Sequence, residues 1–489
     1  MRAYPDEEDT VQPSCPAASR LILAVVALAA AAPARAVPAF ARKYGTSCLT
    51  CHTVFPKLTP FGEAFRRNGF RFPGVDSDYV KQEQVALGQE ANKKTFPNSV
   101  WPATLPSSVP LAVGILGAGN VYPDKTASVP RDNNGTRFSL DDFVTEGQIF
   151  LGASLSDTVT VFGEVSIADG GADVEHASVH FNDLVGPRHL VNLSVGKAPA
   201  TLSSFGPHSS YAGGLAIPDV PVTAIYVDSA DPFALSGNAK GLEVNGVYQG
   251  RFHYAVGLAN SNNGFGGTFN SENWYAAAGY KVGGMRLDGE GEAGPKDPMR
   301  PWAEEALTFH GFVYHSNEHY ADPAAAGVAA NDVSFTVGGG LRAQYRSAEL
   351  DLGYYRQSHN RAFFDPAGSL GKGTDGAFYG ELSYVVYPWM VPFLRLQRIT
   401  LHPSGGTSVS NLHVMPGIAL LVRPNVRLVV AGNVETANGF PQDGSGAPLG
   451  WQGGSGDTGA LVMTPGPTST ASTKTQEFES LLFVFAWAI

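Results

Sequence analysis

The feature that most constrains this fold is a series of short segments, beginning near residue 108, in which apolar and polar residues alternate. Such alternation has the two-residue period of a β-strand with one face in an apolar environment. In one segment, Phe252, Tyr254, Val256 and Leu258 alternate with small or polar residues. Strands of about ten residues separated by glycine-rich connections are typical of transmembrane β-barrels. The pattern therefore predicts a mainly β protein, with an antiparallel, porin-like barrel over residues 101–489.

Connection lengths predict the number of strands, because transmembrane barrels have short turns at one end and long loops at the other. Each long loop must lie an odd number of strands from each tight turn. Sixteen strands satisfy this rule if the apolar stretches 222–229 and 284–292 do not cross the membrane. Both chain ends then lie in the periplasm. Tight turns are expected at 155–158, 249–251, 346–348, 387–390 and 422–425, long connections at 122–142, 198–238, 261–271, 359–374 and 436–476, and an unusually long periplasmic turn at 283–304.

The start of the chain has the pattern of an export signal. An apolar run from Leu21 to Ala32 follows Arg20 and ends at Ala34-Arg35-Ala36, which fits the small-residue cleavage rule. Residues 1–36 are therefore predicted to be a signal peptide. Export favours an outer-membrane barrel over a soluble β-sandwich, the alternative for alternating strands. No run of eighteen apolar residues occurs, which argues against a helical membrane protein.

Cys48, Cys51 and His52 have the Cys-x-x-Cys-His spacing of c-type haem attachment. The chemistry needs two thiols one helical turn apart to reach the vinyl groups of one porphyrin edge, and an adjacent imidazole as axial ligand to the iron. The alternatives are a thiol redox pair and half of a zinc site. The first lacks a thioredoxin-like βαβ pattern, and the second lacks another cysteine pair. The motif predicts one covalent haem c in a small helical module over residues 37–100.

A short helix is expected directly after the motif. Thr59 can cap its start, Pro60 suits its first position, and Gly69 is a typical stop. Arg66 and Arg67 fall in its last turn, where cations complement the helix dipole. Solvent-exposed positions are the commoner outcome for such arginines, and pairing with haem propionates is the alternative.

Residues 38–73 contain a wider pattern, made of Phe40-Ala41-Arg42, Gly45, Cys48, Cys51-His52, Phe55-Pro56, Leu58, Phe61-Gly62, Phe65 and Asn68-Gly69. This pattern resembles the fused cytochrome–porins of bacterial outer membranes. The resemblance implies a monohaem cytochrome module joined to a barrel in the outer-membrane lipid. It also implies oxidation of extracellular Fe(II), with electrons passed to a periplasmic carrier such as a soluble cytochrome.

The small module cannot supply the usual histidine or methionine as sixth ligand of the iron, because it has no histidine after His52 and no methionine. The options are a barrel histidine, a weaker ligand such as Lys57 or water, and an open iron site. In the predicted strand 173–183, alternation turns His176 and His180 toward the lumen. Either could be the distal ligand, and the alternative is two polar residues facing water.

The two predicted parts together favour electron transfer across the outer membrane over classical enzyme catalysis. Electron export to an outside acceptor would use the same parts in reverse. A substrate porin with a structural or regulatory haem is a second class, and peroxide chemistry at an open iron is a third. The formal charge of −11 argues against nucleic acid as a partner, because nucleic acids bind basic faces.

Overall fold

The computed structural model describes most of the chain after residue 38. The predicted signal peptide and the stretch 222–229 lie outside the described residues. The described ranges are 39–74, 76–81, 110–121, 146–168, 171–202, 208–211, 238–260, 273–292, 294–321, 329–364, 370–403, 408–423, 425–438 and 474–488, with the short pieces 84–86, 94, 104–106 and 138–139.

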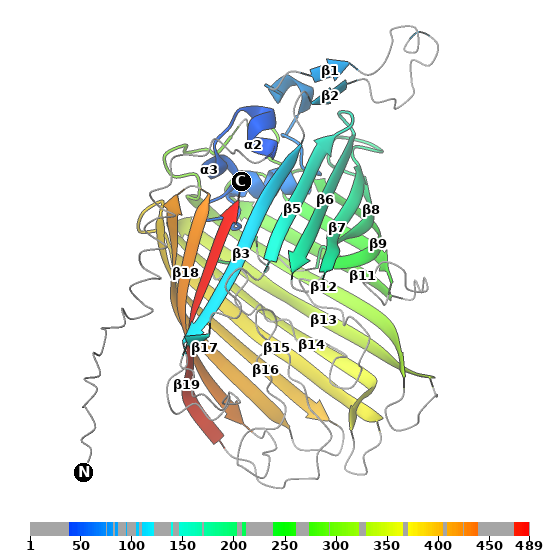
Figure 1. Cartoon of the computed structure of the whole chain (residues 1–489). Helices are drawn as coiled ribbons and strands as arrows, with labels where there is room; N and C mark the ends of the chain where they lie inside the picture. Colours follow the sequence, from blue (N-terminus) through cyan, green and yellow to red (C-terminus); the bar gives the residue numbers. More distant parts are fainter. Residues whose placement is uncertain are drawn as a thin grey trace, which may run out of the picture. The chain divides into compact units, whose positions relative to one another are not determined.

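A closed antiparallel β-barrel makes up most of the described part of the chain (Figure 1). Neighbours in sequence pair with each other throughout, and the last strand pairs with the first, β19 with β3. The two-residue β4 (Phe138–Ser139) only extends the pairing of β3. The other sixteen strands confirm the predicted number: β3 (Leu111–Val121), β5 (Glu146–Ser154), β6 (Val159–Ala168), β7 (Gly171–Phe181), β8 (Asn192–Pro199), β9 (Asn238–Tyr248), β10 (Phe252–Ala259), β11 (Asn273–Gly283), β12 (Glu304–Ala321), β13 (Ala329–Arg346), β14 (Ala348–Phe364), β15 (Leu370–Tyr384), β16 (Met390–Pro403), β17 (Val409–Arg423), β18 (Val426–Asn438) and β19 (Lys474–Ala488).

The connections at one end of the barrel confirm the five predicted tight turns and the long turn, which joins β11 to β12. The predicted loop 359–374 is wrong in extent, because β14 runs to Phe364 and β15 begins at Leu370. Backbone hydrogen bonds between neighbouring strands do not require apolar side chains. The strands therefore continue past the apolar band that the alternation detects.

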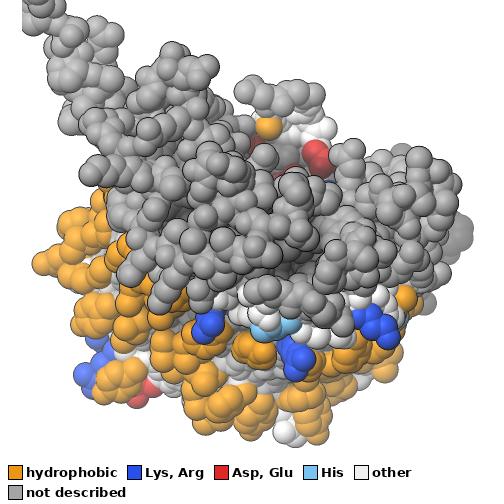
Figure 2. Space-filling view, turned by 90° about the horizontal axis from the view of Figure 1, so that it is seen from below, with side chains coloured by type: hydrophobic (Ala, Val, Ile, Leu, Met, Phe, Trp, Pro, Cys, Tyr) orange, Lys and Arg blue, Asp and Glu red, His pale blue; other side chains and the backbone are white. Residues whose placement is uncertain are grey.

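The outer face of the barrel is apolar. In β10, Val256 and Leu258 are exposed while Ala255 and Ala259 are buried toward the inside, as the alternation predicts. Figure 2 shows hydrophobic side chains over much of the visible barrel surface. Large exposed apolar areas of this kind are typical of a lipid-facing wall. Further exposed members are Val244, Trp274, Phe309, Val337, Tyr354, Phe378 and Leu382.

The N-terminal module consists of α2 (Ala39–Tyr44), α3 (Cys48–Cys51), α4 (Pro60–Arg67), the 3₁₀ turn η1 (Asp76–Tyr79), and the strand pair β1 (Gln84–Ala86) and β2 (Thr104–Pro106). Thr59 caps α4 as predicted, since its hydroxyl accepts from the Gly62 amide at 3.1 Å. Among the described residues, no helix is long and apolar enough to cross a membrane. The module has its own apolar core, made of Tyr44, Phe61, Phe65 and Phe72 together with Met285 of the long turn.

Candidate haem-attachment site

The two motif cysteines lie on a single helical turn. Ser47 caps α3 by accepting from the Leu49 amide at 3.1 Å, and the His52 amide closes the turn by donating to the Cys48 carbonyl at 2.9 Å. Residues three apart share one face of a helix. Cys48 and Cys51 are therefore held on the same side of the turn, which is the arrangement that two thioether bonds to one porphyrin edge require.

The His52 ring is held by the backbone through its Nδ1 atom. Its Nδ1 donates to the Pro56 carbonyl oxygen at 3.2 Å, which places the proton on Nδ1 and leaves the lone pair of Nε2 available. Burial lowers the pKa of His52 to about 4. The imidazole is therefore neutral at physiological pH, the form that binds iron.

The two thiols do not have the character of a redox pair. Both cysteines are free, and burial raises the pKa of the Cys51 thiol to about 12. Catalytic redox cysteines have lowered pKa values, because the thiolate is the nucleophile. Two thiols beside a neutral imidazole instead fit thioether attachment of a haem with His52 as the axial ligand.

Helix α4 is packed directly against this turn. The Thr59 amide donates to the Cys51 carbonyl oxygen at 2.9 Å, and its hydroxyl donates to the Thr50 carbonyl oxygen at 2.8 Å. Gly62 lies so close to the turn that a Cβ atom there would stand 2.1 Å from the Cys51 carbonyl oxygen. Only glycine allows the helix this approach.

Replacing Gly62 by alanine is accordingly expected to force α4 off the cysteine turn. Overpacking of this kind costs about 1–3 kcal/mol, and we expect a lower haem-to-protein ratio in the purified variant. Denaturant unfolding in detergent and haem absorbance measure the two effects. Gly171→Ala is the matched control, because no atom lies within 4 Å of a Cβ there. Equal haem loading and stability in both variants would contradict the close packing.

Buried ion pairs hold the module inside the barrel wall. Lys57 is almost fully buried, and its ammonium group contacts Glu349 of β14. Glu63 of α4 contacts Arg342 of β13, which also pairs with Glu349 at 2.8 Å and lies 3.7 Å from Asp351. The ammonium group of Lys57 is thus paired with a carboxylate and is not available as an iron ligand in this arrangement.

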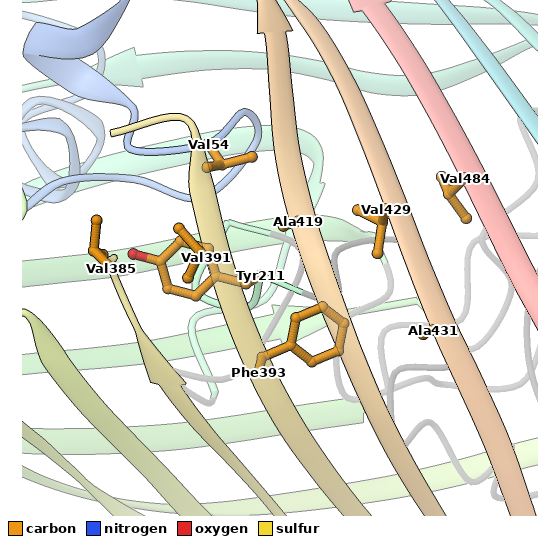
Figure 3. Close-up of a cluster of buried hydrophobic side chains, with 9 residues drawn as sticks. All are labelled: Val54, Tyr211, Val385, Val391, Phe393, Ala419, Val429, Ala431 and Val484. Atoms are coloured by element: carbon orange, nitrogen blue, oxygen red, sulfur yellow. The ribbon is translucent and has the colours of Figure 1, made fainter. Parts of the chain in front are cut away.

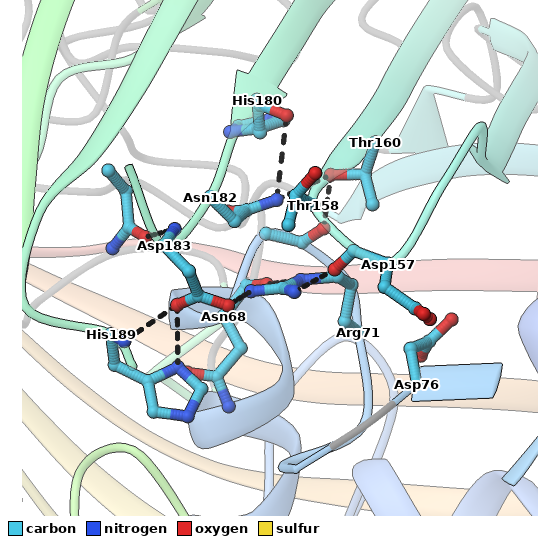
Figure 4. Close-up of polar contacts among 12 residues, drawn as sticks. Asn68, Arg71, Asp76, Asp157, Thr158, Thr160, His180, Asn182, Asp183 and His189 are labelled. Atoms are coloured by element: carbon cyan, nitrogen blue, oxygen red, sulfur yellow. Dashed lines mark hydrogen bonds and ion pairs between the residues drawn. The ribbon is translucent and has the colours of Figure 1, made fainter. Parts of the chain in front are cut away.

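The segment after α4 is bound to the turns at the same end of the barrel. Arg71 contacts the Asp157 carbonyl oxygen and pairs with Asp183 at 3.1 Å (Figure 4). The Asn68 side-chain amide donates to the Asp288 carbonyl oxygen at 2.8 Å. These partners come from three different turns, so the module is anchored around the barrel mouth.

A third set of contacts comes from the long connection between β8 and β9. This connection joins the two strands at the end of the barrel opposite the tight turns. Its residues 208–211 lie against the motif segment, where the Leu58 amide donates to the His208 carbonyl oxygen at 2.8 Å. Lys57 also donates to the Ser209 carbonyl oxygen. The Tyr211 amide donates to Glu381 of β15 at 2.7 Å. Figure 3 shows Val54 of the module and Tyr211 of this connection in one apolar cluster with Val385 of a tight turn and with side chains of the barrel strands, which are Val391, Phe393, Ala419, Val429, Ala431 and Val484.

The predicted distal candidates face the lumen as expected. His176 lies against Phe162, and His180 lies against Phe70 of the module. Both rings are already hydrogen-bonded, since Ser178 bridges His176 and His180 at 2.8 and 2.9 Å, and the second nitrogen of His180 contacts Ser194 at 2.9 Å. The structure thus brings them to the module as parts of a serine–histidine chain.

Sequence reasoning missed the contacts of the module with Arg342, Glu349 and the segment 208–211. The available signal was the set of charges at lumen-facing positions on both sides of the tight turn at Ser347. A lumen-facing charge, however, is ordinarily read as solvated. Only burial in the folded protein distinguishes a partner of the module from a solvated charge.

Comparison with known proteins reveals similarity at the level of structure. No protein-family model and no curated protein sequence matches the chain. Similar solved structures include outer-membrane expressed OmpT of Vibrio cholerae, at 11% identity and a TM-score of 0.45 over 78% of this chain and 98% of that one. An anion-selective porin from Comamonas acidovorans has 12% identity and a TM-score of 0.45 over 78% and 99%. The outer-membrane channel DcaP of Acinetobacter baumannii has 10% identity and a TM-score of 0.44 over 78% and 97%.

Proposed function

We propose that this protein carries electrons across the bacterial outer membrane through one c-type haem, bound by Cys48, Cys51 and His52 in the mouth of the barrel. The observation that carries the proposal is the position of the motif segment, which lies inside the barrel against the inner face of the wall. Buried ion pairs tie it to β13 and β14, and the inserted residues 208–211 also contact it. A haem attached to a mobile appendage would need none of these contacts.

The placement suits transfer through the membrane. The tight turns of transmembrane barrels face the periplasm, so the module would lie at the periplasmic end with both chain termini. A hydrocarbon core about 30 Å thick blocks an electron carrier on its surface. A redox group within the barrel is open to a periplasmic carrier on one side and to a donor in the lumen on the other.

The chain's own residues set the conditions for this chemistry. The bound haem would supply one-electron transfer. His52 offers Nε2 to the iron, because its Nδ1 proton is held by the Pro56 carbonyl oxygen. Lys57 and Glu63 fix the motif segment and α4 to the wall. We propose extracellular Fe(II) as the electron donor and a soluble periplasmic cytochrome as the acceptor, with export to an outside acceptor as the reverse reaction.

A channel with a structural or regulatory haem is the second candidate. The barrel itself favours it, because sixteen strands enclose a lumen wide enough for water. In a channel, solutes would pass through the lumen beside the module. Conductance would then be open and would not fall when the haem is removed, and ferrous iron would not reduce the haem.

The test combines three measurements on the haem-loaded protein in detergent or planar bilayers. We expect a c-type visible spectrum, reduction of the haem within seconds of mixing with Fe(II), and low steady conductance. Failure of Fe(II) to reduce an attached haem, together with open conductance, would support the channel. Absence of covalent haem would overturn both candidates.

A further inference from the structure

The last two residues of α4, Arg66 and Arg67, are partly exposed and partly buried. Because Gly62 packs on the Cys51 carbonyl, α4 has a fixed position relative to the attachment turn. Both guanidinium groups interact electrostatically with inward-facing residues of the barrel wall. The charge of Arg66 is within electrostatic range of His176 and His180 of β7. The charge of Arg67 is within range of His253 of β10 and His310 of β12.

Neither arginine has a carboxylate of its own. Within the described part of the chain, no ion pair or hydrogen bond joins Arg66 or Arg67 to an acidic side chain, and Arg67 Nε is buried without a partner. Glu63 interacts electrostatically with both arginines, and Glu243 interacts with Arg66. Glu63 is engaged by Arg342, and Glu243 accepts from Tyr275 at 2.7 Å and from Thr201 at 2.8 Å.

Burial lowers the pKa values of both guanidinium groups, so their charges are not fully compensated. A guanidinium stays charged under all physiological conditions, and partial burial without a carboxylate partner is unfavourable for it. The histidines around it are neutral or cationic and supply no negative charge. A ligand with two carboxylates would therefore find a guanidinium partner for each of them.

We propose that Arg66 and Arg67 bind the two propionate carboxylates of the haem. The inference rests on the proposed haem at Cys48 and Cys51. A haem c fixed at its thioether edge brings two carboxylates on the opposite edge, which match two guanidinium groups in number and charge. Arginine forms paired hydrogen bonds with carboxylates in one plane. The arginines are positioning residues that orient the haem in the lumen and raise its reduction potential by stabilising the more negative, reduced form.

A free oxyanion such as phosphate has the same chemistry and could occupy the arginines instead. The two sources are distinguishable. Bound propionates stay with the protein through buffer exchange and alter the propionate-bending band in the resonance Raman spectrum. A free anion would make the reduction potential depend on phosphate concentration and leave the propionate band unaffected by the arginines.

The experiment measures the reduction potential and the Raman band in four forms of the haem-loaded protein. These are the wild type, Arg66→Gln/Arg67→Gln, the charge-conserving Arg66→Lys/Arg67→Lys, and Lys281→Gln. The last removes another buried lumen cation, one that already pairs with Glu304 at 2.7 Å. We expect the glutamine variant to have a lower potential and a shifted propionate band. The lysine variant should recover most of the potential, and the Lys281 control should keep the wild-type band.

Two results would overturn the inference while the proposed function stands. The first is an attached haem with the same propionate band in the wild type and the glutamine variant. The second is a wild-type potential that shifts with phosphate and loses this sensitivity in the glutamine variant. Loss of covalent haem in the wild type is a separate result, because it removes the proposed function itself. If the glutamine variant does not fold, the wild-type band and the lysine variant still decide the question.

Discussion

Replacing Cys48 and Cys51 together by serine is expected to leave a folded barrel with no covalently bound haem. A serine hydroxyl cannot form the thioether that the motif requires, so the loss should be complete. The measurement is haem staining after denaturing electrophoresis, with the pyridine haemochrome spectrum of the same sample. Leu49→Ala is the matched control, because it alters the same turn and leaves both thiols.

The barrel should survive this substitution, since its strand pairing is independent of the cysteines. Retention of heat-modifiable migration on a gel would show that the barrel is intact. Haem that still resists denaturation in the serine variant would contradict attachment at Cys48 and Cys51. Loss of haem in Leu49→Ala as well would mean that the shape of the turn, in addition to its thiols, limits attachment.

Replacing Arg342 by methionine is expected to release the module from the wall. Arg342 is buried and faces Glu63 of the module, Glu349 and Asp351. Breaking a buried ion pair by removing one partner costs about 3–5 kcal/mol, because the remaining charges stay buried without compensation. We expect a lower free energy of unfolding, faster proteolysis of the module and higher conductance in bilayers.

Arg346→Met is the matched control for this prediction. Arg346 lies on the same strand, but its pair with Glu305 at 3.5 Å is largely exposed. Water replaces such a pair easily, so the control should resemble the wild type in all three measurements. Adding Glu63→Gln to Arg342→Met should recover part of the stability by removing one orphaned charge. A stable, protease-resistant Arg342→Met protein would show that the module is held by its apolar contacts alone.

The fold was predictable from sequence to a large extent, because strand periodicity is a local property. The alternation in β10 correctly assigned Val256 and Leu258 to the outer face, and connection lengths correctly predicted sixteen strands. The strand ends were less predictable. Beyond the apolar band, β14 and β15 keep their pairing through residues such as His359 and Gly373, where the sequence no longer alternates in hydropathy.

The candidate site was predictable only in its local part. The cysteine turn and the cap at Thr59 follow from neighbouring residues. The environment of Arg66 and Arg67 does not, because their position in a helix says nothing about what the helix end faces. Solvent exposure is the ordinary expectation for the last turn of a free helix, whereas in the barrel Arg66 and Arg67 are partly buried.

The sequence by itself determined the barrel, the cysteine turn and the capped helix, since each depends on residues within a few positions of one another. Only the tertiary structure decided that the module lies inside the barrel, against the inner face of its wall. That placement depends on pairs such as Lys57 with Glu349 and Glu63 with Arg342, which are 292 and 279 positions apart. No local pattern encodes such a pair. In the unfolded chain each of these charged groups is stabilised by water. The two groups of a pair meet only when the closed barrel buries them together.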